Sequence, residues 1–311
     1  MKKLFPALSY AFVLLFAGTL FAQSKETKIR FSVLDEQNSA VKDLQLSDLR
    51  VAINKKAVRI NSLKLSGELP LRVMVVIDRS LSTERTLSVE KLFAEAFIDR
   101  LLKKDFDSVG IIQFSSKVDV LYDPGSNFEL AKTKLKSVET EIPKGYIGGG
   151  MIATTAPPRI TQPGDPVATT SIFDAVSKAV SVLANTSPDT QRNVVLLISD
   201  GVNTGGEKTL KDAVREWELS HVAVFAIGIG DKFYDGVDAK TLKKITEPTG
   251  GVAVVPKKGA DVDAQIAGLA NCMRYFYEAT TTDLLAEPNE IKIEFADQKN
   301  KKLQVNAVIV R

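Results

Sequence analysis

The sequence predicts an α/β fold in which helices cover both faces of a mostly parallel sheet, with a small β-sandwich beside it. Three patterns lead to this prediction. Apolar runs at 71–77, 193–199 and 221–229 are almost uninterrupted, which is typical of strands buried on both faces. Segments with helical spacing separate these runs, so the strands need crossover connections and form a Rossmann-like sheet. Near both chain ends apolar and polar residues alternate, which favours strands with one solvated face.

Strands and helices alternate through the middle of the sequence. Ser171, with Asp174 three positions later, is typical of a capping box at a helix start. An alternating run at 117–122 is expected at a sheet edge. The expected strands are 71–77, 108–114, 117–122, 193–199, 221–229 and 251–255, and the expected helices are 92–101, 127–138, 171–184, 207–219, 238–247 and 261–278.

The two chain ends are expected to form one domain. Residues 26–68 contain short alternating strands, with a hairpin turn at 54–56, and residues 279–311 contain a second predicted hairpin. Because an isolated hairpin is unstable in water, we expect both ends to join into one β-sandwich. The α/β domain, residues 69–278, would then be inserted between the two parts of this sandwich.

Residues 1–22 have the pattern of a secretory signal peptide. Lys2 and Lys3 precede a short apolar run, which ends in small residues near Ala22. The alternative is an uncleaved membrane anchor, although the run is short for a membrane span and contains Pro6. We expect export to the periplasm, the cell surface or the medium, with no membrane span after cleavage.

The charge of the mature chain gives no reason to expect a nucleic acid partner. Of the 41 basic residues, Lys2 and Lys3 are lost with the signal peptide, which leaves 39 against 38 acidic residues. A nearly neutral chain lacks the basic surface on which nucleic acid binding depends.

Oxygen-bearing side chains occur at three places: after two of the predicted strands and just before a predicted helix. Asp78, Ser80 and Ser82 alternate directly after the strand 71–77, Thr170 precedes a predicted helix, and Asp200 follows the strand 193–199. Ligands of open α/β sheets collect beyond the carboxyl ends of the strands. Two carboxylates and three hydroxyls are hard ligands, so we expect a divalent cation, Mg²⁺ first and Ca²⁺ or Mn²⁺ as alternatives. The competing interpretation is that these side chains only cap the following helix.

Three short motifs carry a resemblance to a known family. The stretches DRSLS (78–82), TSIFDA (170–175) and LLISDG (196–201) resemble the metal-ion-dependent adhesion site, or MIDAS, of von Willebrand factor type A domains. The resemblance covers about residues 69–278. The flanking stretches 31–60 and 273–295 are similar to bacterial exported proteins that carry such a domain with added β-strands.

The resemblance implies a role for each of the five residues. Ser80, Ser82 and Thr170 would ligate the cation through hydroxyl oxygens, and Asp78 and Asp200 would act directly or through water. Three departures stand out: Leu81 replaces a frequent glycine, Ala168-Thr169 replaces a glycine pair, and the segment 142–168 is a long Gly- and Pro-rich loop. Thr169 is therefore a competing ligand, and the loop is a candidate recognition surface.

The resemblance favours a binding module over an enzyme. An unidentified protein partner would supply an Asp or Glu to the open cation position, as in adhesion domains. A metal-dependent hydrolase would need a general base, but the sole histidine, His221, is far in sequence from the three motifs. A structural or assembly component of an envelope complex, without metal-dependent binding, is the remaining alternative.

Overall fold

The computed structural model describes residues 26–35, 40–67, 69–142, 146–148, 151–152, 169–184, 190–234, 236–256, 262–283, 291–296 and 303–310. The predicted signal peptide, residues 1–22, lies outside this set, as does most of the segment 142–168. Among the helices in these ranges, none combines the length and the apolar character that a membrane span needs.

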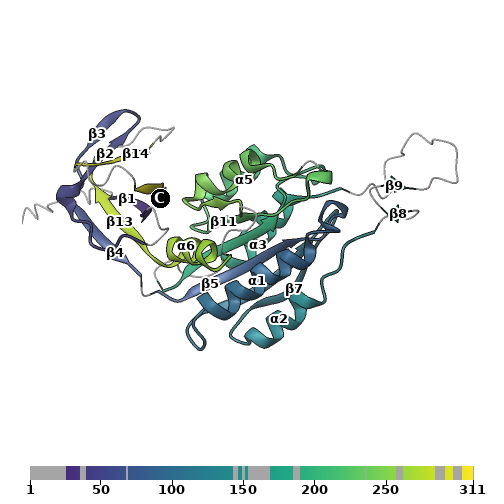
Figure 1. Cartoon of the computed structure of the whole chain (residues 1–311). Coiled ribbons are helices and arrows are strands. Elements are labelled where there is room, and N and C mark those ends of the chain that lie inside the picture. Colours follow the sequence, from purple (N-terminus) through teal and green to yellow (C-terminus); the bar gives the residue numbers. More distant parts are fainter. Residues whose placement is uncertain are drawn as a thin grey trace, which may run out of the picture.

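A six-stranded sheet forms the centre of the larger unit (Figure 1). Its strand order is β12-β11-β10-β5-β6-β7, and neighbours are parallel except for β6 and β7. The predicted edge strand is therefore β7. The bounds are β5 (Leu71–Asp78), β6 (Ser108–Phe114), β7 (Val118–Gly125), β10 (Arg192–Ser199), β11 (Ala223–Gly228) and β12 (Ala253–Val254).

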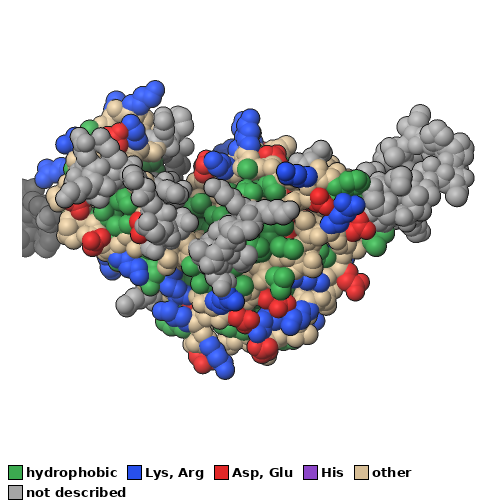
Figure 2. Space-filling view, in the orientation of Figure 1, with side chains coloured by type: hydrophobic (Ala, Val, Ile, Leu, Met, Phe, Trp, Pro, Cys, Tyr) green, Lys and Arg blue, Asp and Glu red, His purple; other side chains and the backbone are tan. Residues whose placement is uncertain are grey.

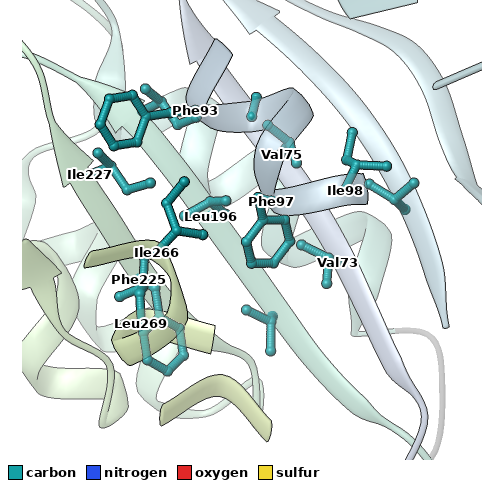
Figure 3. Packing of buried hydrophobic residues seen from close by; sticks show 14 of the residues in the cluster. Val73, Val75, Phe93, Phe97, Ile98, Leu196, Phe225, Ile227, Ile266 and Leu269 are labelled. Atoms are coloured by element: carbon teal, nitrogen blue, oxygen red, sulfur yellow. The ribbon is translucent and has the colours of Figure 1, made fainter. Parts of the chain in front are cut away.

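Helices cover both faces of this sheet. Val73 and Val75 of β5 pack on one face with α1, α2 and α6, whereas Met74 and Val76 pack on the other face with α3, α4 and α5. This alternation explains why the strand is apolar throughout. Figure 3 shows Phe93 and Phe97 of α1 packed against the first face. The bounds are α1 (Leu87–Leu101), α2 (Phe128–Lys136), α3 (Ile172–Leu183), α4 (Leu210–Glu218), α5 (Ala239–Thr246) and α6 (Val262–Arg274).

The two chain ends form a pair of antiparallel sheets at one end of the molecule (Figure 1). One sheet has the order β15-β1-β13-β4 and the other β14-β2-β3. Phe31 and Tyr277 stack in the core between them, with ring centroids 5.4 Å apart. The predicted fold class is confirmed. The bounds are β1 (Thr27–Leu34), β2 (Leu49–Ile53), β3 (Lys56–Val58), β4 (Ser62–Ser66), β13 (Phe276–Thr281), β14 (Ile291–Phe295) and β15 (Gln304–Val310).

The predicted hairpins have different outcomes. β2 and β3 form the N-terminal hairpin, and Asn54 and Lys55 take positive φ angles of 50° and 66°, which fits a tight type I′ turn even without glycine. The second hairpin prediction is wrong. β14 pairs with β2, whereas β15 pairs with β1, so the two strands belong to different sheets. Strands from opposite chain ends pair here, which local sequence does not reveal.

The prediction of one helix over 261–278 is wrong at its C-terminal end. α6 ends at Arg274, and β13 begins at Phe276 and runs between β1 and β4. The stretch 276–281 contains two aromatic and two β-branched residues, a composition that favours a strand. The sandwich strand therefore begins before residue 279, where the C-terminal part was expected to start.

Shorter elements complete the described chain. Within the segment 142–168, β8 (Tyr146–Gly148) and β9 (Met151–Ile152) pair antiparallel, at the end of the molecule away from the sandwich (Figure 1). Four 3₁₀ turns are seen, at Leu46–Asp48, Leu81–Thr83, Lys232–Tyr234 and Glu247–Thr249. On the face drawn in Figure 2, acidic and basic side chains are interspersed, in keeping with the nearly balanced composition.

Candidate metal-ion site

Asp78 is the last residue of β5 and is fully buried. Its Oδ1 accepts a hydrogen bond of 2.8 Å from the backbone N–H of Ser80, and its Oδ2 accepts one of 2.8 Å from the hydroxyl of Ser199. Ser199 ends β10, the parallel neighbour of β5. The carboxylate is thus fixed between the ends of two adjacent strands.

Ser80 and Ser82 connect Asp78 to Asp200. The Oγ atoms of Ser80 and Ser82 lie 3.0 Å apart, and the Ser82 side chain lies near enough to the carboxylate of Asp200 to lower its pKa. Asp200 directly follows β10 and also accepts a hydrogen bond of 2.9 Å from the N–H of Val202. Because β5 and β10 are parallel, their carboxyl ends meet at one edge of the sheet, where these four residues form a series of neighbouring side chains.

Thr170 is held beside this series through its backbone. Its N–H donates to the hydroxyl of Thr204 at 2.9 Å, and its carbonyl accepts from the N–H of Thr204 at 3.0 Å. The next residue, Ser171, donates from its N–H to the carbonyl of Ser115, directly after β6. Thr170, a residue that is 6% exposed, is therefore placed between the end of β6 and the loop that follows Asp200.

The electrostatics of the site favour a cation. Burial, and then the charge of Asp200, raise the pKa of Asp78 to about 7. Burial is also the main cause that raises the pKa of Asp200. The ionised forms of two buried, neighbouring carboxylates are unfavourable, because they lack water and repel each other. A cation bound between them would offset their charge and stabilise both.

Two further residues of the site were not found from the sequence. Ser199 is the orienting partner of Asp78, and its place next to Asp200 in the sequence was the signal available. Glu90 of α1 is fully buried, and burial together with the charge of Asp78 raises its pKa well above the usual range. Its Oε1 accepts a hydrogen bond of 2.9 Å from Thr86, while its Oε2 has no partner among the described residues. Nothing in the local sequence distinguishes Glu90 from an exposed helical acid.

The predicted capping box at Ser171 is wrong. The side chain of Ser171 makes no capping hydrogen bond, and the Oδ1 of Asn203 instead accepts from the N–H of Ile172 at 2.8 Å. Asp174 accepts hydrogen bonds from the N–H groups of Glu207 and Lys208. The loop after β10 therefore supplies the cap of α3 and ties the Thr170 segment to the Asp200 segment.

The donor set fits a hard divalent ion. All side-chain donors in the series are carboxylate or hydroxyl oxygens, which suits Mg²⁺, Ca²⁺ or Mn²⁺. The described residues contain no group of three or more His, Cys, Asp or Glu side chains arranged to hold a metal ion. Hydroxyl groups would therefore have to complete the coordination of a cation at this site.

The fold and this site define a class of protein: a doubly wound α/β domain whose strand ends present a buried cluster of carboxylate and hydroxyl oxygens. Two family models, both described as the von Willebrand factor type A domain, match residues 73–203 and 161–284. Together they span well over half of the 311 residues, and the chain belongs to the von Willebrand factor type A family.

Solved structures of this fold are similar to the chain. Proximal thread matrix protein 1 from the mussel byssus gives a TM-score of 0.51 at 15% identity, over 75% of this chain and 51% of that chain. The same protein with a zinc-occupied MIDAS motif gives 0.50 at 17% identity, over 72% and 50%. BatB from Bacteroides thetaiotaomicron gives 0.45 at 17% identity, over 65% and 96%.

At these identities the likeness shows the fold alone. This chain spans about half the length of the mussel protein. A comparison with curated proteins gives no match.

Proposed function

We propose that the chain is an exported protein-binding module that takes up a divalent cation, Mg²⁺, and captures an acidic residue of a partner protein. The observation that carries this proposal is the gathering of Asp78, Ser80, Ser82 and Asp200 at the carboxyl end of the sheet. The zinc-occupied MIDAS motif of the mussel protein, which has the same fold, supports it. Export rests on the signal peptide pattern of residues 1–22.

Within this proposal, Ser80, Ser82 and Thr170 hold the cation through their hydroxyls, and Asp78 and Asp200 hold it directly or through water. Thr170 is preferred to Thr169 as the cation ligand, because the side chain of Thr169 packs closely against Gly205. A Cβ added to Gly205 would lie only 2.6 Å from the Cβ of Thr169. The bound cation supplies an electrophilic centre that accepts a carboxylate oxygen of the partner.

The segment 142–168 is well placed to contact a partner at this site. Glu141, just before it, donates from its N–H to the carbonyl of Arg79 at 2.7 Å and forms an ion pair of 3.5 Å with the Arg79 side chain. Arg79 lies between Asp78 and Ser80. The segment therefore leaves the domain directly beside the proposed cation position, which supports a role in partner selection.

The geometry gives little support to a metal-dependent hydrolase. His221, the sole histidine of the sequence, precedes β11 at the amino end of the sheet, whereas Asp78 and Asp200 lie at the carboxyl end. Asp78 and Asp200 are both assigned to the cation, so neither of them is left as a general base. The following experiment distinguishes metal-dependent capture from the alternative, an assembly component that binds its partner without a metal.

Affinity capture from a native envelope extract tests the proposal. The full chain and its Asp200→Ala variant serve as baits, each with Mg²⁺ and with EDTA, and Asp119→Asn, on the exposed edge strand β7, is the matched control. A partner retained by the wild-type and Asp119→Asn baits only with Mg²⁺, and lost by Asp200→Ala, supports metal-dependent capture. A partner retained equally under all conditions contradicts it and favours the assembly component.

A further inference from the structure

A cavity with polar and apolar walls lies where the sandwich meets the central sheet, and we call it the junction cavity. It is lined by Arg30 and Ser32 of β1, Arg192 at the start of β10, Trp217 of α4 and Phe276 of β13, together with Phe31, Asn193, Glu218, His221, Val222, Ala223, Thr249 and Gly250. Arg192 begins β10 and Asp200 follows its end, so the junction cavity and the proposed cation site lie at opposite ends of this strand.

The junction cavity contains the half-buried Arg192, whose positive charge no carboxylate among the described residues offsets. The Nη1 of Arg192 is enclosed and has no hydrogen-bond partner among the described residues, while the guanidinium carbon lies 4.0 Å from the ring centroid of Phe276. Burial, and then the positive charge of Arg30, lower the pKa of Arg192 to about 9. Burying an uncompensated cation costs free energy, which a bound anion would recover.

The other charges around the cavity do not compensate Arg192. Arg30 donates from its Nε to Glu278 at 3.0 Å, and Glu278 also pairs with Lys28 at 3.2 Å. Glu218 is the one acid among the described lining residues, and it is not among the groups whose charge shifts the pKa of Arg192. A charged Cys272 would raise the pKa of Arg192, but burial raises the pKa of the Cys272 thiol to about 11, so it is uncharged near neutral pH.

Ser32 contributes a buried hydroxyl that lacks a strong hydrogen-bond partner. The residue is 2% exposed, and its Oγ has no nitrogen or oxygen partner among the described residues. Its hydroxyl meets the thiol of Cys272, which is a weak acceptor. Arg192 and Ser32 thus present two enclosed donors to the same space, one charged and one neutral.

The junction cavity is large enough to hold a small polyatomic group rather than a single water molecule. The cavity measures about 50 Å³, whereas one water needs at least about 10–15 Å³ by this measure. Waters could satisfy the Ser32 hydroxyl, but they would leave the charge of Arg192 without a counter-ion. A phosphate or carboxylate group satisfies both, because a guanidinium fork matches these oxyanions in charge and geometry.

We propose that the junction cavity binds a small oxyanion, such as phosphate or a carboxylate, through Arg192 and Ser32. Arg192 belongs to the central sheet and Ser32 to the sandwich, so the anion joins the two parts of the protein. Its binding raises the stability of the native chain by mass action. The site is separate from the proposed cation site and does not depend on a divalent ion.

Trp217 makes the binding measurable. It is the sole tryptophan of the sequence, it lines the cavity, and its Nε1 is already engaged with the Oγ of Ser177 at 3.0 Å. Its fluorescence is recorded while phosphate, acetate or chloride is added at constant ionic strength, in solutions freed of divalent cations with a chelating resin. We expect a saturable change with phosphate or acetate that chloride does not produce.

Two variants test whether the fluorescence change comes from oxyanion binding in the junction cavity or from a nonspecific effect of the added salt. Arg192→Gln removes the charge and should weaken oxyanion binding at least tenfold, whereas Arg50→Gln, at an exposed position of β2, should bind like the wild type. If Arg192→Gln does not fold, as judged by circular dichroism, Ser32→Ala takes its place, with weaker binding expected. No saturable response in the wild type, or equal responses in the wild type and the cavity variant, would overturn the proposal. Because divalent cations have been removed, this result is independent of cation binding.

Discussion

The hydroxyl of Ser199 donates a hydrogen bond of 2.8 Å to the carboxylate of Asp78, joining the ends of two parallel strands through their side chains. Ser199 also accepts a hydrogen bond of 3.0 Å from the N–H of Gly201, so its oxygen orients the start of the Asp200 loop as well. All of these groups are buried. Ser199 thus positions both acidic segments of the proposed site.

Replacing Ser199 with alanine is therefore expected to lower stability. The variant leaves the N–H of Gly201 and one oxygen of Asp78 without a partner, which should cost about 1–3 kcal/mol of unfolding free energy. Urea unfolding followed by circular dichroism measures this. Ser181→Ala, whose hydroxyl bonds to the Lys178 carbonyl on the exposed side of α3, is the control. An unfolding free energy equal to that of the control would show that Ser199 does not hold the site.

The raised pKa of Asp78 predicts how stability depends on pH without divalent cations. Its pKa is about 7 in the folded chain, against 3.8 for the ordinary group, so the folded state binds more protons between these values. The contribution of Asp78 to stability should then fall as pH rises from about 4 to about 7, and level off above that. Glu90 and Asp200 act in the same direction, because their pKa values are raised too.

Denaturant unfolding in EDTA at several pH values checks this dependence. Asp78→Asn should show a smaller fall in stability over the same window, because one of the titrating groups is gone. Added Mg²⁺ should stabilise the wild type more at the alkaline end of the window, where the acids are ionised. A fall of the same size in the wild type and in Asp78→Asn would contradict the assignment.

A buried ion pair links α6 to the central sheet. The Nη2 of Arg274 lies 2.5 Å from the Oδ2 of Asp107, and Asp107 also accepts hydrogen bonds from the N–H groups of Leu71 and Lys103 at 2.8 and 2.7 Å. Arg274→Met should lower the unfolding free energy by about 3–5 kcal/mol, because it leaves a buried carboxylate without its cation. Thermal unfolding compares it with Arg50→Met, at an exposed position. A loss no greater than that of Arg50→Met would show that the pair contributes nothing.

The sequence was sufficient for the features that depend on local pattern. The uninterrupted apolar run of β5 predicts a strand buried on both faces, and the alternate spacing of Asp78, Ser80 and Ser82 predicts side chains gathered at its end. The features that it did not predict depend on distant partners. The pairing of β15 with β1 and the buried environment of Glu90 are properties of tertiary packing, which no window of the sequence contains.

Calorimetric titration of Mg²⁺ into the purified full chain tests the central claim most directly. We expect uptake of one ion per chain by the wild type and by Asp119→Asn, and no measurable uptake by Asp78→Ala. Because Ca²⁺ and Mn²⁺ suit the same oxygen ligands, they are titrated in parallel. The absence of uptake of all three ions by the wild type, or equal uptake by Asp78→Ala, would contradict the account.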